Sequence, residues 1–132
     1  MPSSPTTLGI DLGTSGVKAV LVDAGDHVVA ATTAPLSVAR PHPAWSEQDP
    51  EDWWSATDAA VRELRARTPD ALRAVRAVGL SGQMHGATLL DAHDTVLRPA
   101  ILWNDGRSAA ECVAPERALP ASRALTPEAT AR

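Results

Sequence analysis

A glycine-rich turn near the N-terminus carries the residue types that bind phosphate. Asp11 ends a short apolar run, Gly13, Thr14 and Ser15 follow it, and Lys18 comes shortly after. Glycine lets the backbone approach an anion closely, and the successive N–H groups of such a turn form an anion-binding concavity. A carboxylate beside a bound phosphate is best used as a ligand of Mg²⁺, direct or through water. An ordinary tight hairpin capped by the aspartate explains the same residues about equally well.

The spacing of this turn separates it from other catalytic motifs. It matches neither the P-loop pattern G-x-x-x-x-G-K-[ST] nor the dinucleotide pattern G-x-G-x-x-G. The sequence has no cluster of His and Cys at metal-ligand spacing. Ser81 lacks the G-x-S-x-G context of a hydrolase nucleophile. Beside the plain hairpin, the remaining interpretation of this turn is therefore phosphate and Mg²⁺ binding.

A second polar turn, at 81–86, follows another apolar run and is flanked by glycines. In α/β sheets, ligands bind beyond the carboxyl ends of the strands. Gln83 and His85 can hydrogen-bond a polyol or a carbonyl group, and Met84 offers a soft apolar wall. The alternative interpretation, which is the commoner situation for a single histidine, is a turn residue whose hydrogen bonds are satisfied within the protein.

A third polar turn combines an aromatic ring with amide, carboxylate and guanidinium groups. It consists of Trp103, Asn104, Asp105 and Arg107, with a glycine between the last two. This set of side chains suits the recognition of a sugar, whose apolar ring face and hydroxyls need both kinds of contact. Alternatively, Asp105 caps a helix that begins at 108–112 and Arg107 is solvated; this interpretation is about as strong.

Turn signals and hydrophobic patterning predict the elements that would hold these turns. Strands are expected at 8–12, 17–23 and 28–36, and the short connections between them indicate an antiparallel meander. A fourth strand is expected at 73–80, running into the second polar turn. A hairpin formed by 87–90 and 96–102 would then lead to the third.

One helix lies between the third and fourth strands. Asp49 is a good N-cap, a proline occupies the first helical position, and Pro69 ends the helix. Trp54, Val61 and Leu64 recur at helical spacing, so they are expected to form its buried stripe. This order of elements predicts an α/β fold with a mixed sheet. Because one helix cannot cover both faces of such a sheet, the chain is expected to be the opening part of a larger domain.

Composition limits the classes of function. The 132 residues carry a net charge of −4 without a basic block, so no nucleic-acid partner is expected. The sequence has no apolar stretch of membrane-spanning length and no secretory signal, and its single cysteine, Cys112, cannot form an internal disulfide. A cytoplasmic protein without a membrane partner is expected. Residues 1–7 are expected to be disordered, and 113–132 to form a weakly ordered tail after a domain at 8–112.

Four stretches in this order resemble a known family. They are I-D-L-G-T-S-G-V-K at 10–18, P-A-W-S-E-Q-D-P-E-D-W-W at 43–54, G-L-S-G-Q-M-H-G-A-T-L-L-D at 79–91 and L-R-P-A-I-L-W-N-D-G-R at 97–107. The chain resembles the N-terminal part of the FGGY family of carbohydrate kinases, most closely the members that phosphorylate D-xylulose. Asp-x-Gly-Thr alone is shared with actin, hexokinase and heat-shock ATPases, whereas the last two stretches are far more specific.

The resemblance implies a fold, an activity and a set of site residues. The fold is the ribonuclease H-like, mixed-sheet fold of actin/hexokinase-type ATPases, of which this chain would be the N-terminal portion of the first of two family domains. The activity is ATP-dependent phosphorylation of D-xylulose to D-xylulose 5-phosphate with Mg²⁺. The implied site residues are Asp11 at the catalytic metal, bound to Mg²⁺ through water; Gly13, Thr14, Ser15 and Lys18 at the ATP phosphates; Gln83, Met84 and His85 at the sugar; and Asn104, Asp105 and Arg107 lining or bracing the same cleft.

The resemblance also implies what this chain lacks. The aspartate that acts as catalytic base in the family, the adenine-binding half and the C-terminal kinase domain all lie beyond the sequence present here. We therefore expect the chain alone to be inactive and the full-length protein, which could form a homodimer, to bind xylulose or a related sugar and ATP. Two alternatives are a family kinase for another polyol, such as ribulose, gluconate or glycerol, and a non-catalytic half-domain.

Overall fold

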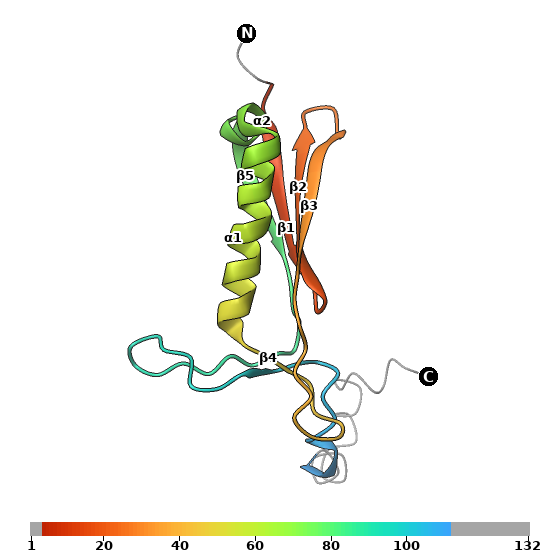
Figure 1. The fold of residues 1–132 in the computed structure, drawn as a ribbon, viewed down its shortest axis with the longest axis vertical. Coiled ribbons are helices and arrows are strands. Elements are labelled where there is room, and N and C mark those ends of the chain that lie inside the picture. The colour runs from red at the N-terminus through yellow and green to blue at the C-terminus, as the bar shows by residue number, and fades with distance from the viewer. Residues whose placement is uncertain (1–3, 112–132) are drawn as a thin grey trace, which may run out of the picture.

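The chain forms an antiparallel meander that one parallel strand extends. A computed structural model describes residues 4–111, with strands β1 (Thr6–Leu12), β2 (Gly16–Asp23), β3 (Val28–Pro35) and β5 (Val75–Ser81). The sheet order is β3-β2-β1-β5, in which β1 pairs antiparallel with β2 and parallel with β5 (Figure 1). The expected mixed α/β sheet is confirmed, and the bounds of its four predicted strands are correct to within two residues.

The first strand begins earlier than expected. Thr6 and Thr7 belong to β1, so the prediction that 1–7 is disordered is wrong for these two residues. The Thr6 hydroxyl donates to the carbonyl oxygen of Ala71 at 2.7 Å, and its backbone N–H donates to that of Ala74 at 3.1 Å. These bonds tie the start of the strand to the helical connection that leads into β5. The predicted tail at 113–132 lies outside the described residues.

The long helix α1 (Pro50–Arg67) begins and ends where the sequence predicts. The Asp49 carboxylate accepts a hydrogen bond from the backbone N–H of Glu51 at 3.0 Å, which caps the first turn. The backbone N–H of Thr68 closes the last turn, and Pro69 opens the short helix α2 (Pro69–Arg73). Neither helix is long and apolar enough to cross a membrane.

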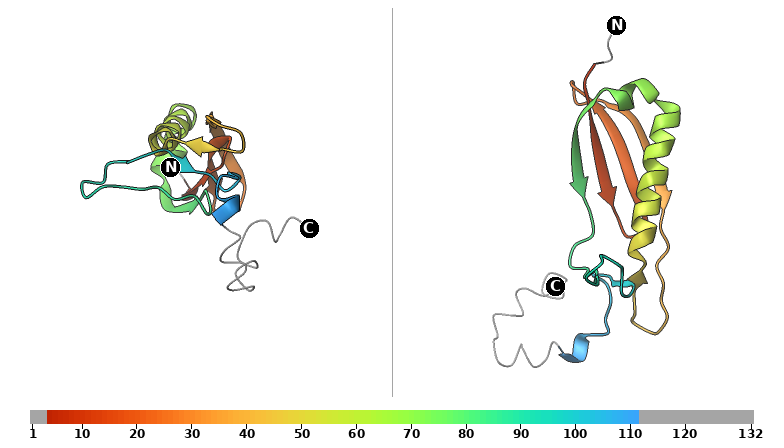
Figure 2. Two further views of the ribbon diagram at one scale, coloured as in Figure 1. Left: turned by 90° about the horizontal axis from the view of Figure 1, so that it is seen from below. Right: turned by 90° about the vertical axis from the view of Figure 1, so that its left-hand side faces the viewer.

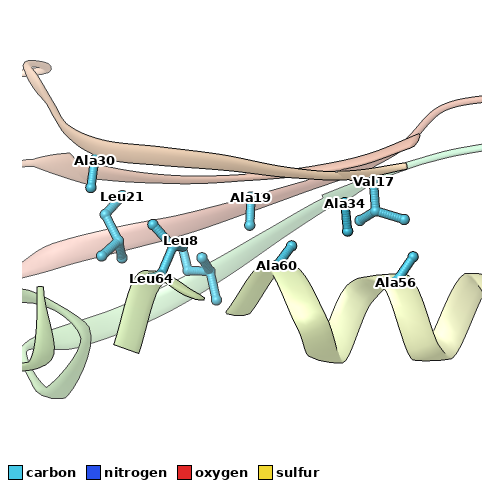
Figure 3. Close-up of a cluster of buried hydrophobic side chains, with 9 residues drawn as sticks. All are labelled: Leu8, Val17, Ala19, Leu21, Ala30, Ala34, Ala56, Ala60 and Leu64. Atoms are coloured by element: carbon cyan, nitrogen blue, oxygen red, sulfur yellow. The ribbon is translucent and has the colours of Figure 1, made fainter. Parts of the chain in front are cut away.

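Helix α1 packs on one face of the sheet through small side chains (Figure 3). The core residues are Leu8, Val17, Ala19, Leu21, Ala30, Ala34, Ala56, Ala60 and Leu64. The expected stripe is confirmed at Leu64 but wrong at Trp54, whose side chain is 72% exposed. Ala56 and Ala60 face the sheet instead, and the buried Thr32 hydroxyl donates to the Ala60 carbonyl oxygen at 2.8 Å. An indole at this interface would hold the helix too far from the sheet for that bond to form.

The edge strand β5 lies outside the cover of α1, which packs over β2 and β3 (Figure 2). Val78 and Leu80 are in register with Leu8 and Ile10 of β1, yet they are 56% and 79% exposed. The expectation that one helix cannot cover such a sheet is confirmed for the described residues. An apolar patch is therefore exposed on β5.

A small second sheet lies beyond the carboxyl ends of β1 and β5 (Figure 2). Its strands are β4 (Glu47–Gln48) and β6 (Ala100–Ile101), which pair antiparallel. The expected hairpin of 87–90 with 96–102 is confirmed as isolated antiparallel bridges, which join Leu90 to Val96 and Ala87 to Ile101. The end of its second segment also pairs with β4. We call residues 44–48 together with 98–107 the platform.

Candidate functional site

The three polar turns of the sequence meet at one side chain, that of Thr14. The Gln83 side-chain amide donates to Thr14 Oγ1, and the indole Nε1 of Trp103 donates to the same oxygen, each at 3.3 Å. Gln83 follows β5, Thr14 lies between β1 and β2, and Trp103 belongs to the platform. The fold thus gathers residues from all three predicted motifs at the carboxyl edge of the two parallel strands, where α/β sheets bind ligands.

The first turn is tight because its glycines leave no room for side chains. The backbone N–H of Gly13 donates to the Gly16 carbonyl oxygen at 3.0 Å, which closes the turn. A Cβ on Gly16 would lie 2.7 Å from the Ala34 carbonyl oxygen, well inside van der Waals contact. Within residues 4–111, no hydrogen bond uses the backbone N–H of Thr14 or Ser15. These two donors are the ones that an anion could engage.

Asp11 and Lys18 lie opposite each other on neighbouring strands, on the sheet face that points away from α1. Both side chains are exposed, and they border a shallow hollow of about 310 Å³ whose floor includes Gly9 and Gly79. The described residues contain no group of three His, Cys, Asp or Glu side chains able to hold a metal. One carboxylate nevertheless fits Mg²⁺, which keeps several waters and takes further ligands from substrate phosphates.

The second turn presents His85 and Met84 to solvent. His85 has φ 59°, in the left-handed region, which costs most side chains energy but is tolerated more often by histidine. Its neighbour Met84 is 71% exposed. A left-handed residue that neighbouring structure holds in place is common at ligand-binding turns. Gln83 differs from both because it is half-buried and bonded to Thr14.

The third turn contains one buried carboxylate and one exposed amide. Asp105 accepts hydrogen bonds from Nε and Nη2 of Arg107 at 2.8 and 2.7 Å, and from the backbone N–H of Ser46 at 2.6 Å. The Arg107 guanidinium, followed by the backbone N–H groups of Ser46 and Arg107, holds the pKa of the Asp105 carboxyl far below its usual range. Both oxygens of Asp105 are engaged inside the protein, whereas Asn104 is exposed beside Trp103.

Arg107 holds the platform together. Its guanidinium lies 3.6 Å above the Trp45 ring and 2.8 Å from the Glu47 carboxylate, in addition to its bonds to Asp105. The Asp105 hydrogen bond, and after it the Glu47 bond, raises the pKa of Arg107. Arg98 also reaches Glu47, at 3.1 Å. The interpretation of Arg107 as a solvated residue is therefore wrong, because its side chain is only 13% exposed.

Sequence reasoning missed one residue of this site, Gln48. Its side chain is 2% exposed and donates to the carbonyl oxygens of Thr14, at 2.7 Å, and Ser37, at 3.1 Å. Its own side-chain oxygen accepts a hydrogen bond from the Trp53 indole at 2.9 Å. Gln48 therefore anchors the backbone of the first turn to β4. The signal was present in the stretch at 43–54, to which no role was assigned.

Comparison with known proteins agrees with this geometry. A model of the N-terminal domain of the FGGY family of carbohydrate kinases matches residues 6–125. This chain belongs to the FGGY family. Xylulose kinases from Escherichia coli K12 and Klebsiella pneumoniae are similar FGGY sequences, each 60% identical over 119 residues, which are 90% of this chain and 24% of theirs. The chain thus spans about a quarter of the length of these relatives.

Solved structures of similar proteins confirm the fold class that was expected for this chain. The crystal structure of a xyloylose kinase from Brucella ovis is 56% identical, with a TM-score of 0.85 over 90% of this chain and 25% of that one. The xylulose kinase from Rhodospirillum rubrum is 37% identical, with a TM-score of 0.75 over 86% of this chain and 23% of that one. The mixed sheet described here is the N-terminal portion of the actin/hexokinase-type fold that these kinases share.

Proposed function

We propose that the full-length protein containing this chain transfers the terminal phosphoryl group of ATP to a hydroxyl of D-xylulose, forming D-xylulose 5-phosphate. The observation that carries the proposal is the convergence of a phosphate-type turn and two polar turns on Thr14, through Gln83 and Trp103. A kinase needs its donor phosphate and its acceptor hydroxyl in reach of each other. The similarity to proteins named xylulose kinase supports the choice of sugar.

The first turn would hold the phosphates. The free N–H groups of Thr14 and Ser15 and the close backbone at Gly13 suit phosphate oxygens, and Lys18 adds positive charge on the open face of the sheet. Asp11 would hold Mg²⁺ through water. When bound, Mg²⁺ neutralises negative charge on the phosphates during transfer.

The other two turns would hold the sugar. His85 and Met84 are exposed and bordered by Gln83, so a hydroxyl and an apolar ring edge could both find partners there. Asn104 is exposed at the neighbouring turn. The Asp105 carboxylate is engaged by Arg107 and Ser46, so its proposed role is to brace the turn beside the sugar.

Several parts of this proposal concern the longer protein. We place the enzyme in the cytoplasm, where ATP is available and where a chain with one cysteine needs no disulfide. Residues 8–112 would be a partial kinase domain, followed by a weakly ordered tail at 113–132. A homodimer of the full-length protein stays a prediction. The chain alone would give no xylulose-dependent ADP release above that of Asp11→Ala, because the catalytic base and the second domain lie outside it.

Steady-state kinetics of the full-length enzyme test the two roles. Asp11→Ala should lower kcat strongly with little change in the KM for xylulose, since its interaction strengthens in the transition state. His85→Ala should first raise that KM, by roughly five- to 150-fold, because about 1–3 kcal/mol is lost when a hydroxyl contact disappears. An unchanged KM in His85→Ala together with a tenfold rise in Asp11→Ala would reverse our assignment. Equal or better turnover of ribulose, gluconate or glycerol would contradict xylulose as substrate.

A further inference from the structure

The side-chain oxygen of Thr14 accepts hydrogen bonds from two donors, and this determines where its own hydrogen can point. A threonine hydroxyl has one O–H donor and two acceptor lone pairs. The indole nitrogen of Trp103 can only donate, so the 3.3 Å contact makes Thr14 Oγ1 an acceptor. The Gln83 amide nitrogen donates to the same oxygen, also at 3.3 Å. Both lone pairs are then occupied, and the O–H hydrogen must point away from Gln83 and Trp103.

The backbone of Thr14 is fixed independently of its side chain. The buried Gln48 amide donates to the Thr14 carbonyl oxygen at 2.7 Å, and the Trp53 indole holds Gln48 from behind at 2.9 Å. These hydrogen bonds hold the backbone of Thr14 in place. Among the hydrogen bonds of the described residues, the Thr14 hydroxyl accepts two and donates none.

We propose that Gln83 and Trp103 are positioning residues for the phosphate turn, which orient the Thr14 hydroxyl outward as a hydrogen-bond donor to a phosphate oxygen. Gln83 was expected at the sugar and Trp103 in a sugar-recognising turn, whereas in this proposal both act on the nucleotide side, through Thr14. The proposal rests on the proposed function, since it supposes that this turn binds ATP phosphates. Preorganised donors of this kind require no reorganisation when the ligand arrives.

A double-mutant cycle in the full-length enzyme tests the route through Thr14. Trp103→Phe removes the indole donor and keeps an aromatic ring, while Thr14→Val removes the acceptor at the same volume. Each should lower kcat/KM for ATP by about three- to tenfold, as expected for one hydrogen bond. Because both remove the same contact, the double variant should be no worse than Thr14→Val alone. Losses that multiply would overturn the proposal.

Three further variants separate positioning from structure and from sugar binding. Trp54→Phe is the matched control, because Trp54 is 72% exposed on α1 and should leave kcat/KM unchanged. Gln83→Met removes the second donor and should act on ATP kinetics in the same direction. Thr14→Ser keeps the hydroxyl, so the effect of Trp103→Phe should persist in that background. If Trp103→Phe raised only the KM for xylulose, Trp103 would be a sugar contact and the proposal would be wrong.

A spectroscopic measurement decides the contact without any activity. The indole N–H resonance of Trp103, identified by its loss in Trp103→Phe, should shift in Thr14→Val and stay in place in Thr14→Ser. An indole signal that ignores Thr14→Val overturns the inference whatever the enzyme phosphorylates. If the wild-type enzyme phosphorylated no sugar, the proposed function would be refuted. A shift of the indole signal in Thr14→Val would still establish the contact between Trp103 and Thr14.

Discussion

The layer formed by α1 and the meander differs from the platform in the forces that hold it together. In the layer, Val17, Leu21 and Leu64 are fully buried among alanines, and the contacts are apolar. In the platform, two carboxylates surround the guanidinium of Arg107. Apolar packing contains no charges for salt to screen and no groups that titrate, whereas ion pairs respond to both salt and pH. The comparison teaches that the scaffold and the site of this domain can be disturbed separately.

The largest effect is expected in the layer. Leu64→Ala should lower the free energy of unfolding by about 2–5 kcal/mol, because it leaves a cavity between α1 and the sheet. Leu80→Ala is the control, since Leu80 is 79% exposed and its loss should change stability by less than about 0.5 kcal/mol. Urea unfolding curves at low and high salt measure both. A strong salt dependence of the Leu64 effect would break the distinction between the two regions.

A smaller effect is expected where the meander meets the site. Gly16→Ala places a methyl group 2.7 Å from the Ala34 carbonyl oxygen and should destabilise by about 1–3 kcal/mol. Gly79→Ala is the matched control, because nothing lies within 4 Å of its Cβ. Thermal unfolding of the two variants provides the measurement. Equal melting temperatures would show that β3 can move away from the first turn.

The platform should respond to acid before the layer does. The pKa of Asp105 is lowered in the folded state, so its contribution is fully present above the ordinary value of 3.8. As the pH falls below 3.8, Asp105 binds a proton in the unfolded chain but not in the folded protein. The free energy of unfolding therefore decreases as the pH falls toward the lowered pKa. Tryptophan fluorescence should report a change around Trp45 there. In Asp105→Asn this part of the pH dependence should vanish; if it persists, another group is responsible.

The smallest effect concerns the backbone of the platform. Ala44 has φ 64°, where an L-residue is strained, and Gly106 donates to its carbonyl oxygen at 2.7 Å. Ala44→Gly should therefore raise stability by up to about 1 kcal/mol. The same change at the exposed helical Ala59 should lower stability by about 0.5–1 kcal/mol. Chemical unfolding of the pair tests the opposite signs, and a loss in both would argue against strain at Ala44.

The layer was largely predictable from sequence, and the platform was not. Turn signals and an Asp49 cap locate the meander and α1 because these are local properties. The buried stripe was misjudged because large side chains were weighted above Ala56 and Ala60, which only the close approach to the sheet selects. In the platform, two-residue strands have no periodicity to detect. Their pairing depends on Arg107 meeting Glu47 across a long stretch of chain.

The three-turn site was predicted in part. The residue types at each turn indicated phosphate and polar ligands, and the carboxyl-edge rule marked the second turn as a place where ligands bind. The bonds that Gln83 and Trp103 make to Thr14 could not be predicted, because they depend on side-chain directions that only the assembled fold determines. Gln48 was missed for the same reason: its three partners belong to three separate segments.

The order of strands in the sheet also determines the order in which the domain can fold during synthesis. The meander pairs neighbours along the chain, so β1, β2 and β3 can assemble as soon as they leave the ribosome, and α1 can follow. β5 can pair with β1 only after the intervening strands and helices have been made, and the platform forms only after Arg107 has left the ribosome. Until β5 pairs with β1, the nascent domain carries an open edge at β1, with which other chains could pair. Slow translation through 75–81 would prolong this exposure, and a chaperone that shields edges would act there.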